Sequence, residues 1–369
     1  MAKGPSSWVT TALVRSISAF VACGLSLSIA CGPSPSPDSQ AKTSTEPTTI
    51  LIATERASRG GRLVHVGADG ARLAPLTSLA SGSVVVDRSP TFTPDGQRIV
   101  FTSNREREDL SDTSLWVIAT GGGGEPHRLT SGDYVDRDPR VSRDGAWVYF
   151  CSNRGGSFDL YRARIGESAL SETEQITKSD KQILSPSLSP DGQMVAYMEV
   201  DEQGQSSLWR AASDGSGAPQ RLSEGPMDMT PAWGAEGQIA FAARAEGRSD
   251  TDLYLMDTDG KNRRKVVDAP KTDETGPRWS YDGRYLFAIG MYRSATDGKP
   301  LLGSIVFVDL KERELRLRAI HDPSAVESRI GLALAPFAIS ARELHKNPPY
   351  QDALHDILLQ TAIDNASKK

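Results

Sequence analysis

Histidine and cysteine are scarce in this chain of 369 residues, which has five of the first and three of the second. The histidines are His65, His127, His321, His345 and His355. No His-Glu-x-x-His motif and no Cys-x-x-Cys pair occurs, so the spacings that announce a zinc site are missing. We therefore expect neither a metal nor another cofactor.

Motifs for hydrolysis and for phosphate binding are missing too. No Gly-x-Ser-x-Gly elbow is present. The run Gly121–Gly124 lacks the Lys-Ser/Thr of a phosphate-binding loop, and Asp257–Gly260 has too few carboxylates for a calcium loop, so both are interpreted as hairpin turns. No catalytic residue can be named, and we expect a protein that is not an enzyme.

An excess of basic residues is also absent. The chain has 42 Lys and Arg against 47 Asp and Glu, a net charge of −5. Nucleic-acid binding needs a basic surface, so a nucleic-acid partner is excluded.

What the chain has instead is a seven-residue pattern that occurs five times: Pro, any residue, a large apolar residue, two variable residues, an acid and Gly. The copies are 90–96, 139–145, 186–192, 231–237 and 277–283. Their final glycines are 49, 47, 45 and 46 residues apart. A period of this length is typical of stacked or radially arranged units. The fourth copy departs from the pattern at Gly234–Gly237, where we expect a distorted turn but no lost unit.

Each copy leads into the same series of short segments. An apolar strand such as 98–101 follows the Asp-Gly turn, and a polar loop, a third strand such as 115–117 and a fourth, more polar strand such as 128–130 come next. These runs are rich in β-branched and aromatic residues and too short for helices. Four short antiparallel strands in each repeat predict a propeller blade.

The ends of the chain complete the predicted ring. Residues 50–77 match the second, third and fourth strands of a further unit that lacks its first strand. The apolar segment 330–335 is expected to supply that strand, which closes the ring and removes exposed strand edges. The prediction is thus an all-β, six-bladed β-propeller of four-stranded antiparallel blades. A short C-terminal helix, about 351–365, is expected to dock on it.

Three sequence features together resemble the TolB-type six-bladed propeller repeat over roughly residues 48–340: the Pro-x-Trp-Ser-x-Asp-Gly form of 277–283, the Ser-Asn-Arg loops 103–105 and 152–154, and the Asp-x-Asp-Gly turn 257–260. The resemblance implies a noncatalytic scaffold for protein–protein interaction in the cell envelope. Related propellers include lyases and hydrolases that act on sugars or peptides, so an enzyme with its site at the central channel is the alternative.

The N-terminus predicts export. Residues 1–30 have the basic start and apolar run of a signal peptide. Small residues before Cys31 resemble a bacterial lipobox, with Cys23 as a competing lipidation site. Residues 31–48 form a Pro/Ser/Thr-rich tether, 49–340 the propeller and 341–369 a helical tail. We expect a monomeric, lipid-anchored periplasmic protein, at the outer membrane if the organism is Gram-negative.

Acidic residues precede several of the predicted first strands. They are Asp87, Asp136, Asp138, Asp228 and Asp273, with Glu274 beside the last of them. Because the innermost strand of each blade lines the central channel, these carboxylates are predicted to form a partial ring at one channel mouth. Such a ring attracts a cation or a basic segment of a protein partner. The alternative is that each acid caps its own turn and faces water.

Three further expectations are structural. The aromatic residues that recur in phase should form the blade core, namely Phe92, Trp116, Tyr161, Trp209, Trp233, Tyr254 and Trp279. Cys151 should be a small buried residue. The loop arginines Arg56, Arg105, Arg154 and Arg244 recur once per blade and should make a shared structural contact.

Overall fold

The computed structural model describes residues 28–31, 49–56, 60–67, 73–77, 84–107, 109, 111–121, 124–245, 247–267, 272–279, 283, 285–293, 300–310, 314–319 and 338–340. Among these residues every regular element is a β-strand, and none of them forms an apolar helix of the length that crosses a membrane. The all-β prediction is therefore confirmed. The predicted helix at 351–365 lies outside the described residues.

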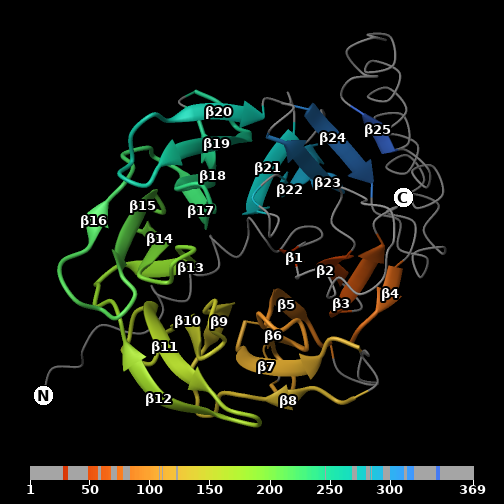
Figure 1. Cartoon of the computed structure of the whole chain (residues 1–369), viewed down its shortest axis with the longest axis vertical. Coiled ribbons are helices and arrows are strands. Elements are labelled where there is room, and N and C mark those ends of the chain that lie inside the picture. Colours follow the sequence, from red (N-terminus) through yellow and green to blue (C-terminus); the bar gives the residue numbers. More distant parts are fainter. Residues whose placement is uncertain are drawn as a thin grey trace, which may run out of the picture.

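The described strands form six antiparallel sheets (Figure 1). The first two contain β1 (Ser28–Cys31), β2 (Thr49–Arg56), β3 (Gly60–Gly67) and β4 (Leu73–Pro75), then β5 (Asp87–Phe92), β6 (Arg98–Ser103), β7 (Ser114–Ala119) and β8 (His127–Arg128). The next two contain β9 (Asp136–Val141), β10 (Trp147–Ser152), β11 (Asp159–Ile165) and β12 (Leu170–Gln175), then β13 (Gln182–Leu188), β14 (Met194–Val200), β15 (Ser206–Ala212) and β16 (Gln220–Arg221). The last two contain β17 (Asp228–Trp233), β18 (Gln238–Arg244), β19 (Thr251–Asp257) and β20 (Arg264–Val267), then β21 (Thr272–Trp279), β22 (Tyr285–Arg293), β23 (Pro300–Asp309), β24 (Glu314–Ala319) and β25 (Ala338–Ser340).

Four consecutive sheets, from β5 to β20, are the four-stranded antiparallel blades that the repeat predicts. Their strands pair in sequence order, and in Figure 1 the first strand of each lies nearest the centre of the ring. Each innermost strand also contacts the innermost strand of the next sheet. The propeller architecture is therefore confirmed, and these four blades carry the site described below.

The expected closure of the ring is wrong in this structure. The inner edge of β2 is taken by β1, in the register Ser28 to Ala53 and Cys31 to Ile50, and β1 contacts both β5 and β21. On the C-terminal side, β25 pairs with β24 at the outer edge of the last sheet, which therefore has five strands. Segment 330–335, predicted to fill the edge of β2, lies outside the described residues. Four apolar or small residues at 28–31 suit this inner edge, although the apolar N-terminal segment that contains them predicts export.

The repeated Asp-Gly turn is held by a hydroxyl group. Ser142 donates a hydrogen bond to Asp144 at 2.5 Å, and its oxygen accepts the N–H of Trp147 at 2.9 Å. This hydroxyl lowers the pKa of Asp144. Gly145 has φ 72°, a left-handed conformation that favours glycine. Equivalent hydroxyl-to-carboxylate bonds join Thr93 to Asp95 and Ser189 to Asp191.

The irregular fourth copy keeps its turn and its blade, as expected. Gly237 has φ 73°, but its N–H lies 3.4 Å from the oxygen of Gly234, against 2.9 Å for the corresponding bond of Gly145. A β-carbon on Gly234 would lie 2.5 Å from an indole carbon of Trp279 in the next sheet. A serine at position 234, like Ser142 and Ser189 in other copies of the repeat, would therefore collide with Trp279.

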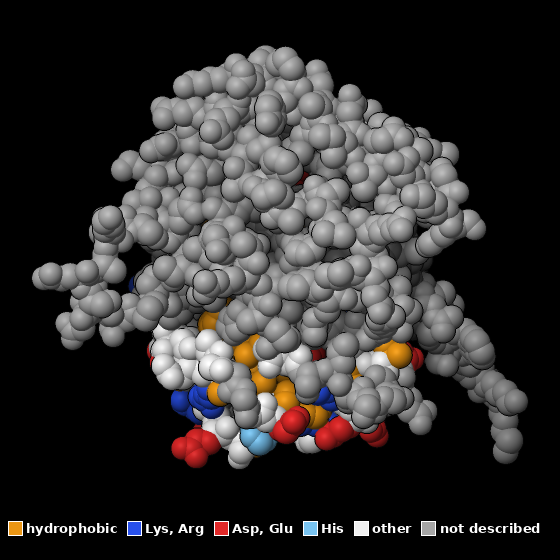
Figure 2. All heavy atoms as spheres, turned by 90° about the vertical axis from the view of Figure 1, so that its right-hand side faces the viewer, with side chains coloured by type: hydrophobic (Ala, Val, Ile, Leu, Met, Phe, Trp, Pro, Cys, Tyr) orange, Lys and Arg blue, Asp and Glu red, His pale blue; other side chains and the backbone are white. Residues whose placement is uncertain are grey.

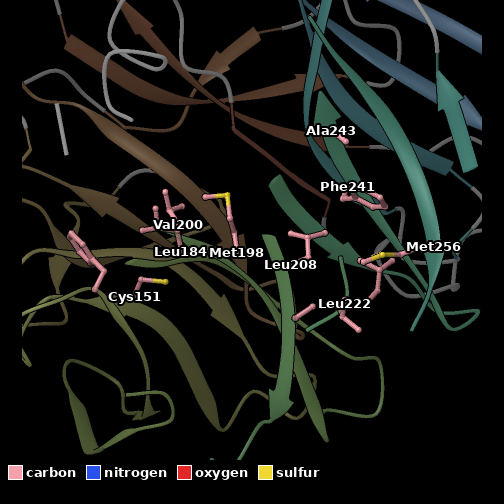
Figure 3. Close-up of a cluster of buried hydrophobic side chains, with 12 residues drawn as sticks. Cys151, Leu184, Met198, Val200, Leu208, Leu222, Phe241, Ala243 and Met256 are labelled. Carbon is pink, nitrogen blue, oxygen red and sulfur yellow. The ribbon is translucent and has the colours of Figure 1, made fainter. Parts of the chain in front are cut away.

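The hydrophobic core lies between neighbouring sheets. Cys151 and Phe158 of one sheet pack with Leu184 and Met198 of the next, and the same cluster continues to Phe241 (Figure 3). The in-phase aromatic residues are all members of such clusters or packed against them. Two structural expectations are thereby confirmed: the aromatic series forms core, and Cys151 is fully buried.

Candidate functional site

The innermost strands carry an acid at one repeated position. Five residues occupy this position, because each pairs with a residue at the same place in the second strand of its sheet. They are Asp87, Asp136, Ile183, Asp228 and Glu274, and their partners are Ser103, Ser152, Glu199, Ala243 and Gly290 in that order. Four of the five are acids. The four acids are all at most 1% exposed. Burying a carboxylate costs free energy unless it is paired or protonated, so each of them needs a partner or a proton.

Asp87 is neutralised by the Ser-Asn-Arg loop of its own blade. Arg105 donates to its two oxygens at 3.2 and 2.8 Å, and Ser103 donates to it at 2.7 Å. Between them, Asn104 accepts the N–H of Val86 at 2.7 Å, which fixes the entry to β5. The Ser-Asn-Arg loop therefore supplies the hydrogen-bond donors that allow this carboxylate to be buried.

The next blade repeats this arrangement, and a later one varies it. Arg154 binds Asp136 at 3.0 Å, and Asn153 accepts the N–H of Val135 at 2.8 Å. Asp228 is instead paired at 2.8 Å with Arg263, which comes from the turn between β19 and β20. The shared structural contact expected of the loop arginines is thus confirmed for Arg105 and Arg154. The side chain of Arg56 lies outside the described part.

Glu274 has no arginine among its described contacts. One of its carboxylate oxygens accepts a hydrogen bond from Thr272, and the other has no hydrogen-bond partner among the described residues. Burial, together with the negative charges of Asp252 and Asp273, raises the pKa of Glu274 to about 8. The protonated form of the side chain therefore predominates at pH 7. Of the two predicted neighbours Asp273 and Glu274, Glu274 is the in-phase member of the series, and Asp273 accepts the N–H of Thr251 at 3.1 Å.

A second in-phase position links the sheets around the axis. The residue before the repeated proline is left-handed in all five strands: Ser89, Asp138, Ser185, Thr230 and Gly276 have φ between 48° and 62°. Asp138 accepts hydrogen bonds from Ser89 of the preceding sheet at 2.9 Å and from the N–H of Ser185 in the following sheet at 3.2 Å. The carboxylate of Asp138 therefore ties three consecutive blades together.

The predicted acids are thus brought to the inner strands but not into an open ring. Asp87, Asp136 and Asp228 are buried and paired with arginines, so they present no free carboxylate to solvent. The alternative that each acid faces water is wrong for these three. Among the described residues, no group of three or more His, Cys, Asp or Glu is arranged to hold a metal ion. Contact of these acids with a partner stays a prediction.

The described outer surface is mixed in charge. Figure 2 shows acidic and basic side chains close together along the lower edge of one face, next to apolar groups. Ion pairs such as Arg162 with Glu174 and Arg164 with Glu172 on the outer strands of one blade follow the same trend. The described part of this surface therefore shows no extended region that carries charge of one sign only.

Radial four-stranded sheets with in-phase carboxylates on their inner strands define a repeat-built β-propeller. Residues 77–280 match the TolB beta propeller domain (PD40), and the chain belongs to this family.

Similar proteins include TolB homologues. The "Protein TolB homolog" of Chlorobium luteolum is 31% identical over 144 residues, which are 39% of this chain and 31% of the relative. The "Tol-Pal system protein TolB" of Francisella tularensis subsp. mediasiatica is 22% identical over 240 residues, 62% of this chain and 54% of the relative. The matches thus span between a third and about half of the length of these relatives.

Solved structures share the fold. TolB from Acinetobacter baumannii superposes with a TM-score of 0.57 at 18% identity, covering 74% of this chain and 65% of that one. A puromycin hydrolase gives a TM-score of 0.51 at 18% identity, covering 74% of this chain and 44% of that one. At such identities the likeness establishes architecture, which serves binding proteins and enzymes alike.

Proposed function

We propose that this chain is a noncatalytic binding scaffold of the bacterial cell envelope, a TolB-like propeller lipoprotein that mediates protein–protein interaction. The observation that carries the proposal is the family match over residues 77–280 together with relatives named for the Tol-Pal system. The buried acids support it, because Asp87, Asp136 and Asp228 are engaged with arginines and are poorly placed for acid–base chemistry.

The proposed molecule is a six-bladed ring acting as a monomer. Four complete blades, two further sheets and the cyclic contacts of the innermost strands support this count. A lipid on Cys31, followed by the tether of residues 32–48, would hold the ring near a membrane. That arrangement leaves the loops at both ends of the channel free to meet a periplasmic protein, whose identity the fold does not specify.

Crosslinking in the native cell, followed by mass spectrometry, tests the binding role. We expect one or a few envelope proteins to be captured, and each to bind the purified propeller in a calorimetric titration. As a contact test, Asp138→Asn is preferable to changes at the buried acids, because asparagine tolerates the left-handed backbone and keeps the volume. Weaker capture by this variant would make Asp138 a partner contact; unchanged capture would leave it a structural link.

Lipidation has a separate test. Cys31→Ser should abolish labelling by an alkyne fatty acid and release the protein from membranes, while Cys23→Ser serves as the matched control. If Cys23→Ser abolishes labelling instead, the anchor is at Cys23.

The second candidate function is an enzyme with its site at the channel, a lyase or hydrolase for sugars or peptides. The shared architecture with puromycin hydrolase favours it as an alternative. Turnover of aminoacyl or oligosaccharide substrates by the purified protein, with no captured envelope protein, would replace the scaffold proposal.

A further inference from the structure

The bulge at Asp138 brings two arginines to the same face of β9. Arg137 pairs with Cys151 and Arg140 pairs with Tyr149, and the register shifts by one residue between these pairs. Cys151 and Tyr149 are two residues apart and share one face of β10, so Arg137 and Arg140 share that face as well. Without the bulge, residues three apart would point to opposite sides of the strand.

Position in the ring places this face beside the axis and against the next sheet. Cys151 and Tyr149 both pack against residues of β13 and β14. The guanidinium of Arg137 lies 4.3 Å from the centre of the Phe158 ring, at the same seam between sheets. Both arginines are half-buried. They belong to β9, the innermost strand of its blade (Figure 1).

The hydrogen-bonding capacity of these two side chains is almost unused. No described residue accepts a hydrogen bond from Arg137, whose Nε is buried. Arg140 donates one bond, to the carbonyl of its neighbour Pro139 at 2.6 Å. Each guanidinium has five N–H donors, so most of those donors are left without a described protein partner.

The nearby acids Asp138 and Asp136 hydrogen-bond to residues other than these two arginines. Asp138 is engaged by Ser89 and Ser185 and forms no ion pair with either arginine within the described part of the chain. Asp136 is bound by Arg154. Burial lowers the pKa of both Arg137 and Arg140, which shows that their charges are held where solvation is reduced. The negative charge of Asp138 opposes this effect at both arginines, so one carboxylate compensates the two positive charges only in part.

The fold itself does not require this pair. The two aligned positions hold Arg88 and Thr91 in the preceding blade, Leu184 and Ser187 in the next, Met229 and Ala232 in the one after it, and Thr275 and Arg278 in the last sheet. Arg278 donates to the carbonyl of Pro277 as Arg140 does to that of Pro139. A single arginine thus recurs at each position, but among these five strands only β9 carries both. A pair of positive charges that is only partly compensated, and that the other described blades lack, is typical of a binding site.

We propose that Arg137 and Arg140 form a site for a small oxyanion, a carboxylate or a phosphate, on the channel side of the second described blade. The planar forks of two guanidinium groups on one face suit the paired oxygens of either anion. This proposal stands independently of the envelope-scaffold function, since it concerns the charge of the channel and not a protein partner.

Titration calorimetry of the purified protein tests the site with inorganic phosphate and with citrate, at constant ionic strength set with chloride. The test variant carries Arg137→Leu with Arg140→Ser, the residues of the next blade. The control is Arg143→Ser, which removes an exposed arginine three residues away. We expect the test variant to bind the preferred anion at least about tenfold more weakly, and the control to bind like the parent. The stronger of the two anions in the parent identifies the chemical class.

Stability in chloride alone separates a binding role from a structural one. If the arginines are kept for a ligand, the test variant unfolds at a urea midpoint equal to or above that of the parent. A large loss of stability in the variant would overturn the proposal, as would equal binding by parent and variant. Should the double variant fail to fold, Nε–Hε NMR signals of the parent decide: phosphate or citrate must shift two arginine signals that Arg137→Lys and Arg140→Lys identify, and unshifted signals overturn the site.

Discussion

Glu274→Gln should make the stability of this protein less dependent on pH. In the folded chain burial and the neighbouring carboxylates raise the pKa of Glu274 to about 8, from an ordinary value of 4.5. The folded state therefore binds a proton more tightly than the unfolded state, and between these two values it loses stability as the pH rises. The contribution of Glu274 is fully favourable below pH 4.5 and is lost by about pH 8.

The size of the effect follows from the two pKa values. Each unit of difference is worth about 1.4 kcal/mol, so the whole window amounts to at most about 5 kcal/mol. From pH 5 to pH 7.5 the parent should lose about 3 kcal/mol through this group alone. Glutamine mimics the protonated acid in shape and has no charge to bury, so the variant should escape that loss.

Urea unfolding at half-unit steps from pH 5 to pH 7.5 measures the effect. The free energy of unfolding of Glu274→Gln, minus that of the parent, should rise steadily across this range. Glu236→Gln, which alters an exposed carboxylate in a turn, is the control and should show a flat difference. Parallel pH profiles for Glu274→Gln and the parent would refute the reasoning, because they would mean that Glu274 is ionised in the folded state at neutral pH.

Three further predictions concern the repeat itself. Arg105→Ala should lower the free energy of unfolding by about 3–5 kcal/mol by stranding the buried Asp87, and adding Asp87→Asn should restore part of that loss in chemical denaturation. Gly234→Ala should lower the thermal midpoint, because the new methyl group overlaps the indole ring packed there; a midpoint equal to the parent's contradicts this. Ser189→Ala should cost about 1 kcal/mol and move the pKa of Asp191 upward in an NMR titration, while an unmoved pKa would show that this hydroxyl is not its main partner.

Periodicity predicted the blades because each copy satisfies its own backbone locally. The hydroxyl, carboxylate and glycine of 142–145 lie within one turn, so their spacing is visible in the sequence. In the sequence the acids and the loop arginines recur as two separate patterns. That Arg105 pairs with Asp87 is not visible there, because 18 residues separate them. Their contact depends on how β5 and β6 align, and that is a property of the folded sheet.

The candidate site was less predictable for the same reason. A bulge at each left-handed residue shifts the alternation of side chains between the two faces of the strand. The face on which a given side chain lies could therefore not be predicted by counting residues along the sequence. That shift brings Arg137 and Arg140 to one side. The phase of Glu274 was by contrast visible in the sequence, since Glu274 stands three residues before the repeated proline, as Asp87 does. Burial of Asp87 was missed, because an acid before a strand is ordinarily a solvated turn residue.

If the chain is processed as a lipoprotein, the strand β1 makes the structure of the ring depend on that processing. Its residues Ser28–Ala30 precede the cysteine at which a lipoprotein signal would be cut, and yet they cover the inner edge of β2. If cleavage occurs there, the precursor and the finished protein differ by most of one strand beside the axis. Maturation would then uncover backbone N–H and C=O groups on β2, and a donor segment from this chain or from another would gain a place to add as a strand.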